Sequence, residues 1–306
     1  MALKLGGHRG SGCTDHAHYQ SLRNIAALPV ENTINSVHAA FDNGADYVEI
    51  DAVSAADGTI FCLHNVVPRD HFFGPIIPGD NLNNLSFAQI QEHPTGRQQN
   101  GTIAPLTDML TIIQQIDPHT LPWSVNIEIK GVQGSGQPVE SGDFIRHIVL
   151  AIEAANFPVE RVLFSSFSLA NILHMSQLLP QARYGMLFAE QKDEEKPIYT
   201  DHQDDPHYYY LQFTPSRLHD VMQKWKTHAH PEARLEYAHP EIRTITPEML
   251  TAVKQYGVGI NSWSLRETFN EDRATLYRQV IGECMEQDVP MTVITDYLPE
   301  IKKLGL

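Results

Sequence analysis

The sequence predicts a (β/α)8 TIM barrel with a small insertion after its second strand. Short apolar runs typical of strands alternate with segments of helical periodicity along most of the 306 residues. Repeated alternation of this kind favours a parallel sheet that is covered by helices. A hairpin signal near residue 58 and a loop-rich stretch at about 66–105 account for the departures from a simple eightfold pattern. We expect residues 1–306 to form a single domain, since no linker or repeat divides them.

Nine strand-like segments occur, one more than an eight-stranded barrel needs. The third follows Asp57-Gly58, a two-residue hairpin signal, so we expect it to turn back antiparallel onto the second. Without this returning strand, eight β–α units remain. The expected strands are LKLGGHR (3–9), YVEIDAV (47–53), IFCLHN (60–65), WSVNIEIK (123–130), RVLFSSF (161–167), RYGMLF (183–188), LEYAHP (235–240), VGINSWS (258–264) and MTVITD (291–296).

Helices are expected between most of these strands. Segments 32–44, 144–156 and 246–257 have apolar residues at helical spacing. In the last of them Thr246 suits the N-cap and Pro247 suits the first turn.

Two stretches have the composition of loops. Residues 66–105 are rich in Gly, Pro and Asn and predict an insertion carried on the second unit. Residues 190–215 are charged and then aromatic, and they predict a long surface loop.

The composition of the chain indicates which kinds of binding partner to expect. A net charge of -15 and a pI of about 5.4 argue against nucleic acid and anionic membranes as main partners. Three cysteines, Cys13, Cys62 and Cys284, lack metal-ligand spacing, and so few fit a reducing compartment. No apolar run resembles a signal peptide or a transmembrane helix. We therefore expect a cytoplasmic protein without stable membrane insertion.

Acidic side chains within apolar strands indicate a metal site. Glu49 and Asp51 share one face of the second strand, where two buried like charges would repel unless a cation lay between them. Glu128 and Lys130 share a face of the segment 123–130 in the same way. Functional side chains of such barrels lie at the C-terminal ends of strands. Three carboxylates there form a hard oxygen ligand set that suits one divalent cation, Mg²⁺ or Ca²⁺.

Basic and imidazole groups flank these acids. Arg9 suits a phosphate through its bidentate fork, and Lys130 does so as a point charge. His8 and His64 can divide proton transfer, because imidazole titrates near neutral pH. Pairing about the hairpin would place His64 roughly opposite Asp51. A metal, two phosphate-binding cations and a histidine pair together indicate phosphoester cleavage.

The order of the motifs GGHRG, ENT, EID, DG…HN, IEIK, SSFS, W and TD resembles that of the glycerophosphodiester phosphodiesterases over nearly the whole chain. The resemblance implies a TIM barrel with an insertion after the second strand. It also implies hydrolysis of glycerophosphocholine, glycerophosphoethanolamine and similar diesters to sn-glycerol 3-phosphate and an alcohol. Glu49, Asp51 and Glu128 would bind the divalent metal, and Arg9 and Lys130 would contact the phosphate.

The same resemblance assigns the remaining site residues. It implies that His8 and His64 are the acid/base pair, with His8 activating the nucleophile and His64 protonating the leaving alcohol, or the reverse. Glu31, in the ENT motif, would lie beside the site and orient Arg9 or His8. Trp263 would line the pocket for the glycerol or alcohol part. The chain departs from the family pattern at Asn65, where the family usually has Asp.

Two other functions stay open on the sequence. One is phospholipase D-like hydrolysis of lysophospholipids or sphingolipids on the same barrel, and the other is a non-catalytic barrel that binds a phosphorylated ligand. The two proton-transfer groups argue against the second. His239, at the end of the segment 235–240, could also reach the pocket.

Overall fold

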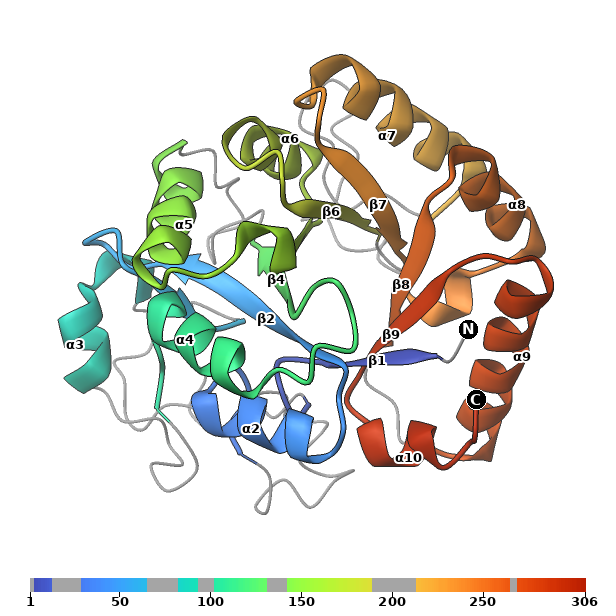
Figure 1. Cartoon of the computed structure of the whole chain (residues 1–306), viewed down its shortest axis with the longest axis horizontal. Coiled ribbons are helices and arrows are strands. Elements are labelled where there is room, and N and C mark those ends of the chain that lie inside the picture. The colour runs from blue at the N-terminus through green and yellow to red at the C-terminus, as the bar shows by residue number, and fades with distance from the viewer. Residues whose placement is uncertain are drawn as a thin grey trace.

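The computed structural model describes residues 3–12, 29–64, 82–92, 102–130, 142–188, 213–264 and 269–306. Eight parallel strands close into a barrel, and helices surround it (Figure 1). The (β/α)8 prediction is therefore confirmed. The strands are β1 (Lys4–Gly7), β2 (Tyr47–Ser54), β3 (Ile60–Cys62), β4 (Val125–Ile129), β5 (Val162–Ser166), β6 (Arg183–Leu187), β7 (Arg234–His239), β8 (Gly259–Trp263) and β9 (Met291–Thr295).

All nine predicted strand segments contain a strand, and β3 is the extra one. It pairs antiparallel with β2, with Ala52 opposite Cys62, after a turn in which Gly58 has a φ of +83°. Leu63 N donates to the Asp51 carbonyl at 3.1 Å. Leu63 thus faces Asp51, and His64 lies one residue beyond the position that the hairpin predicted.

The barrel closes because β1 pairs in parallel with both β2 and β9. Going round from β1, the order is β9, β8, β7, β6, β5, β4 and β2. The first strand of the chain thus lies beside the last, and the segments that follow both strands meet at one end of the barrel.

The helices are α2 (Ile34–Asp42), α3 (Phe87–Glu92), α4 (Leu106–Ile116), α5 (Gly142–Ala154), α6 (Leu169–Leu178), α7 (Pro215–His228), α8 (Pro247–Tyr256), α9 (Glu271–Glu286) and α10 (Leu298–Lys302), with short 3-10 turns η2 (Leu82–Asn84), η3 (Val159–Arg161) and η6 (Ile242–Thr244). The three helices that the periodicity predicts are present as α2, α5 and α8. Thr246 caps α8 by accepting from Met249 N, Pro247 occupies its first turn, and Gly257 ends it in the left-handed region. None of the described helices is long and apolar enough to span a bilayer.

Part of the predicted insertion at 66–105 lies within the described residues. Elements η2 and α3 pack on the β2–β3 hairpin through a small second core that includes Phe61, Leu82, Phe87 and Ile90. Residues 66–81 and 93–101 lie outside the described residues, as do 190–212 of the predicted surface loop.

The inside of the barrel is filled by its own cluster, separate from the core between strands and helices. Tyr47, Trp123, Leu163 and Ile294 form this cluster. Tyr47 Oη donates to Asn261 Oδ1 at 2.7 Å, from β2 to β8, which are not neighbours in the sheet. A Cβ at Gly6 would lie 2.2 Å from the Tyr47 ring, so glycine in β1 makes room for it. The filled interior gives the strand ends above it a rigid floor.

Candidate active site

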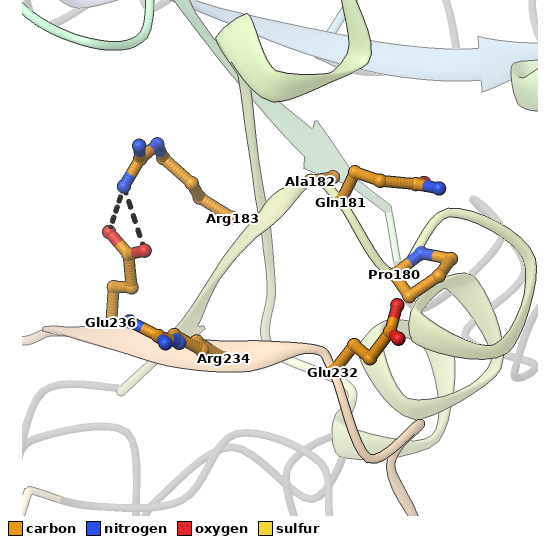
Figure 2. A pocket seen from close by; sticks show the side chains of 7 residues that line it. All are labelled: Pro180, Gln181, Ala182, Arg183, Glu232, Arg234 and Glu236. Atoms are coloured by element: carbon orange, nitrogen blue, oxygen red, sulfur yellow. Dashed lines mark hydrogen bonds and ion pairs between the residues drawn. The ribbon is translucent and has the colours of Figure 1, made fainter.

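Charged side chains gather at both ends of the barrel. At the amino end, the starts of β6 and β7 line a cleft of about 320 Å³ (Figure 2). There Arg183 Nη1 donates to both carboxyl oxygens of Glu236, at 2.7 and 2.6 Å. This cleft contains none of the predicted site residues. They lie at the other end, beyond the carboxyl ends of the strands, where sites of this fold occur.

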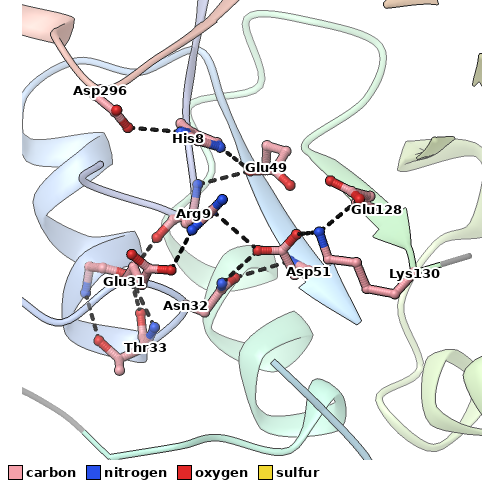
Figure 3. Close-up of polar contacts among 11 residues, drawn as sticks. His8, Arg9, Glu31, Asn32, Thr33, Glu49, Asp51, Glu128, Lys130 and Asp296 are labelled. Atoms are coloured by element: carbon pink, nitrogen blue, oxygen red, sulfur yellow. Dashed lines mark hydrogen bonds and ion pairs between the residues drawn. The ribbon is translucent and has the colours of Figure 1, made fainter. Parts of the chain in front are cut away.

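Three carboxylates from two neighbouring strands meet at this mouth of the barrel (Figure 3). Glu49 and Asp51 project from β2, and Glu128 lies opposite Asp51 on β4. One oxygen of each lies within 4.8 Å of the other two. Glu49 is 3% exposed and Asp51 is 0% exposed. The structure thus brings together the three acids that the sequence singles out.

Burial and mutual repulsion shape the protonation of this cluster. Burial and the adjacent Asp51 raise the pKa of Glu49 to about 8. Burial also raises the pKa of Glu128, although Lys130 opposes the shift. Burial acts in the same direction on the pKa of Asp51, but Lys130, His64 and Arg9 outweigh it and hold that pKa below its usual value. Without an added cation, the cluster therefore keeps a proton that a divalent ion would displace.

Two positively charged side chains, Lys130 and Arg9, contact the acidic cluster. Lys130 Nζ contacts Asp51 Oδ1 and donates to Glu128 Oε1 at 2.7 Å. Arg9 Nη1 donates to Glu31 Oε1 at 2.6 Å, and Arg9 Nε lies 3.4 Å from Asp51 Oδ2. Of the two partners predicted for Glu31, Arg9 is the one that it contacts here.

The backbone of Arg9 contributes as well as its side chain. Its φ of +50° lies in the left-handed region, and its N–H donates to Glu49 Oε2 at 2.9 Å. The turn after β1 therefore points both the amide and the guanidinium of one residue at the acidic cluster. A left-handed non-glycine residue is a strained feature of the kind found at functional sites.

Asn32 is a site residue that the sequence reasoning missed. It accepts from Asp51 N through Oδ1 at 3.0 Å and donates to Asp51 Oδ2 through Nδ2 at 2.8 Å. The residue is fully buried, and its φ is +56°. Asparagine tolerates this conformation and offers both a donor and an acceptor. The ENT motif contained it, but nothing in the local pattern showed that it would clamp an acid of the next strand.

His8 follows β1 and is held by another residue outside the predicted set. Its Nδ1 lies 2.8 Å from Asp296 Oδ1, and its Nε2 lies 3.9 Å from Glu49 Oε2. Burial lowers the pKa of His8, but the Asp296 carboxylate outweighs it and the net pKa is raised. Asp296 ends the TD motif after β9, and only the closure of the barrel brings it to His8.

His64 lies in a different environment. Its Nδ1 is buried and has no hydrogen-bond partner among the described residues. Burial, Arg9 and Lys130 lower its pKa well below the usual value, against the smaller opposing effect of Asp51. His64 comes directly after Leu63, whose N–H donates to the Asp51 carbonyl, so it lies at the same mouth as Asp51. Asn65, at which the chain departs from the family pattern, lies outside the described residues.

Trp263 and His239 lie on the far wall of the barrel from the acids, on β8 and β7. Trp263 Nε1 donates to the His239 carbonyl at 2.9 Å, and its ring meets Phe167 edge to face with centroids 6.0 Å apart. The His239 ring is fully buried over Gly185, where a Cβ would lie 2.1 Å from its Nε2. Burial lowers the pKa of His239 to about 3. In the described part of the chain, no hydrogen bond or ion pair joins this ring to the acidic cluster. We therefore describe His239 as a buried packing residue of the barrel wall.

Comparison with known proteins agrees with this geometry. Residues 8–292 match the sequence profile of the Glycerophosphoryl diester phosphodiesterase family. No protein with a curated description matches the chain. Several solved structures have the same fold at low sequence identity.

Three of these structures illustrate the likeness. One is an Oleispira antarctica phosphodiesterase solved with its product sn-glycerol-3-phosphate, at 18% identity and a TM-score of 0.65, covering 99% of this chain and 96% of that one. Another is the glycerophosphodiester phosphodiesterase of Agrobacterium tumefaciens, at 16% identity and 0.63, covering 99% of both chains. The third is from Galdieria sulphuraria, at 17% identity and 0.67, covering 100% of this chain and 99% of that one.

Proposed function

Because the chain belongs to the glycerophosphoryl diester phosphodiesterase family, we propose that it hydrolyses glycerophosphodiesters such as glycerophosphocholine and glycerophosphoethanolamine. The products would be sn-glycerol 3-phosphate and an alcohol. One observation carries this proposal: three converging carboxylates are flanked by two cations and two histidines at the mouth of the barrel. The substrate is a small molecule, and we propose that the enzyme acts in the cytoplasm.

The three carboxylates fit the divalent cation that this family implies. Glu49 Oε1 is buried and has no hydrogen-bond partner among the described residues, so it has a lone pair to offer. Glu49, Asp51 and Glu128 would hold the ion as hard oxygen ligands, which suits Mg²⁺ or Ca²⁺. Bound there, it would supply Lewis-acid polarisation of a phosphate oxygen.

Arg9 and Lys130 would grip the phosphate. Arg9 is held in place from two sides by Glu31 and Asp51, so its fork is oriented before substrate arrives. Lys130 bridges Asp51 and Glu128 and adds a second fixed positive charge. Preorganised charges of this kind stabilise the negative charge that develops on the phosphoryl oxygens.

His8 and His64 would move the protons. In one assignment His8 removes a proton from the attacking water and His64 delivers one to the leaving alkoxide, and in the other the two exchange roles. Water attacks phosphorus, the P–O bond to the alcohol breaks, and the alcohol leaves protonated. Trp263 would form an apolar wall beside the glycerol or alcohol part.

A substrate panel tests the proposal. The purified chain is treated with EDTA, Mg²⁺ or Ca²⁺ is added back, and release of sn-glycerol 3-phosphate from glycerophosphocholine and glycerophosphoethanolamine is measured. We expect metal-dependent turnover that is abolished in His8→Ala and kept in His219→Ala, which removes an exposed histidine of α7. Faster turnover of lysophosphatidylcholine would support the phospholipase D-like alternative. Binding without turnover of any of these substrates would support the non-catalytic one.

A further inference from the structure

The geometry points to Asp296 as a positioning residue that orients the His8 ring and selects Nε2 as the nitrogen it presents to the substrate. The inference rests on the proposed function, because it concerns the same site. Asp296 belongs to none of the roles described above. Its contact with the proposed catalytic groups is the one with His8 Nδ1.

The register of the barrel seam places the two residues side by side. Gly7 of β1 pairs with Thr295 of β9, and the next backbone contact, from His8 N to the Thr295 carbonyl, is 3.1 Å long. His8 and Asp296 are therefore the first residues beyond the paired strands. Neighbouring strands lie about 4.8 Å apart, so their side chains can meet directly.

The contact is short and protected from water. Asp296 Oδ1 lies 2.8 Å from His8 Nδ1, and the Asp296 side chain is 2% exposed. Figure 3 marks this contact with a dashed line between the two side chains. An ionised carboxylate only accepts hydrogen bonds, so Nδ1 must carry the proton that it receives. The seam is fixed further by Tyr297 N, which donates to Thr295 Oγ1 at 2.9 Å.

With Nδ1 engaged, Nε2 is the nitrogen left to exchange a proton. It lies on the side of the acidic cluster, 3.9 Å from Glu49 Oε2. The partner of one ring nitrogen thus sets both the tautomer and the direction of the other. The same logic does not extend to His64, whose Nδ1 has no hydrogen-bond partner in the described residues.

Asp296 is a better candidate for this role than for metal binding. The group of oxygens within 4.8 Å of one another contains Glu49, Asp51 and Glu128 but, among the described residues, not Asp296.

Two substitutions test the assignment through kinetics. Asp296→Ala removes the acceptor, and we expect kcat for glycerophosphocholine to fall roughly 10²- to 10⁴-fold, the range that general acid–base catalysis contributes, while KM changes less than threefold. Added formate should raise the kcat of Asp296→Ala at least tenfold, because formate fits the volume that the missing carboxylate leaves. It should restore nothing in Asp296→Leu, where the side chain fills that volume.

A spectroscopic readout separates orientation from general damage. In chain labelled with 15N in the histidine rings, the His8 signal, identified by its loss in His8→Ala, should show a proton on Nδ1 in the parent. Asp296→Asn keeps the shape of the residue but can turn its amide donor toward Nδ1, so the proton should move to Nε2.

An unchanged His8 tautomer in Asp296→Asn, or kcat within threefold of the parent in Asp296→Ala, would overturn the inference. Failure of the parent chain to cleave any glycerophosphodiester would instead overturn the proposed function. The tautomer measurement would still decide the role of Asp296 in that case.

Discussion

The two ends of the barrel carry similar residues but balance their charges differently. At the amino end two acids each have their own cation: Lys4 Nζ lies 2.9 Å from Asp46 Oδ1, and Arg183 Nη1 lies 2.6 Å from Glu236 Oε2. At the carboxyl end the fixed cations are outnumbered. Among the described residues around the acidic cluster, the carboxyl groups are Glu31, Glu49, Asp51, Glu128 and Asp296, and the fixed cations are Arg9 and Lys130.

This difference in charge balance distinguishes a surface that only supports the fold from one that suits binding or catalysis. Paired charges on a partly exposed surface contribute little to stability and need nothing else. Crowded buried acids raise the free energy of the fold, and such an arrangement persists where a ligand or a reaction makes use of it. Charge balance, rather than the presence of charge, therefore distinguishes the mouth as the candidate site.

The largest expected effect comes from neutralising one acid of the mouth. We expect Glu49→Gln to lower kcat/KM for glycerophosphocholine by more than about 10³-fold, because it would remove a proposed metal ligand. Stability should change by less than about 1 kcal/mol, because burial and Asp51 already raise the Glu49 pKa to about 8 and Gln resembles the protonated acid. Urea unfolding and steady-state kinetics measure the two effects.

The matched control, Glu236→Gln at the amino end, should leave kcat/KM within about twofold of the parent value. Equal losses in both variants would remove the distinction between the two ends.

A smaller effect, on stability, is expected when a divalent cation is added to the acidic cluster. Mg²⁺ or Ca²⁺ at about 100 times its dissociation constant should stabilise the chain by roughly 2.7 kcal/mol, seen as a rise in Tm. The rise should be lost in Glu128→Gln and kept in Glu232→Gln, which alters the cleft at the amino end. A rise of the same size in Glu128→Gln would show that the ion binds elsewhere.

The stability of the fold should fall in acid because of His239, the buried histidine of β7. Burial lowers the His239 pKa to about 3 from its ordinary 6.5, so between those values the unfolded chain binds more protons than the folded one. Stability from the neutral ring is therefore complete above pH 6.5 and falls as the pH drops toward 3.

At pH 5 this loss should be about 2 kcal/mol, at 1.36 kcal/mol for each pH unit below 6.5. Urea midpoints at pH 7 and pH 5 measure it, and His239→Gln should remove most of the difference because its side chain does not titrate. An undiminished difference in the variant would assign the acid sensitivity to other groups.

The smallest effect should come from breaking an ion pair at the amino end. Arg183 and Glu236 are each 26% exposed, so we expect their coupling energy in a double-mutant cycle with Gln substitutions to be about 1 kcal/mol or less. Activity should not change in either single variant. A coupling of several kcal/mol, or a fall in turnover, would mean that this cleft does more than support the fold.

Much of the fold and of the site follows from local patterns. Strand alternation places Glu49 and Asp51 on one face whatever the rest of the chain does, and the Asp57-Gly58 turn explains the ninth strand. The polar residues inside apolar strands therefore identified the acids, both histidines and both cations before any coordinates. The proposed roles of those residues remain for the experiments above to test.

The remaining contacts of the site depend on the closed barrel. His8 and Asp296 are 288 positions apart, and they meet because β1 pairs with β9 in one particular register. Asn32 reaches Asp51 because the segment before α2 adopts a left-handed turn beside β2. The sequence alone determined which groups line the mouth, because side-chain periodicity along a strand is local. Only the tertiary structure decided which of those groups touch, because strand register and barrel closure are set by packing over the whole chain.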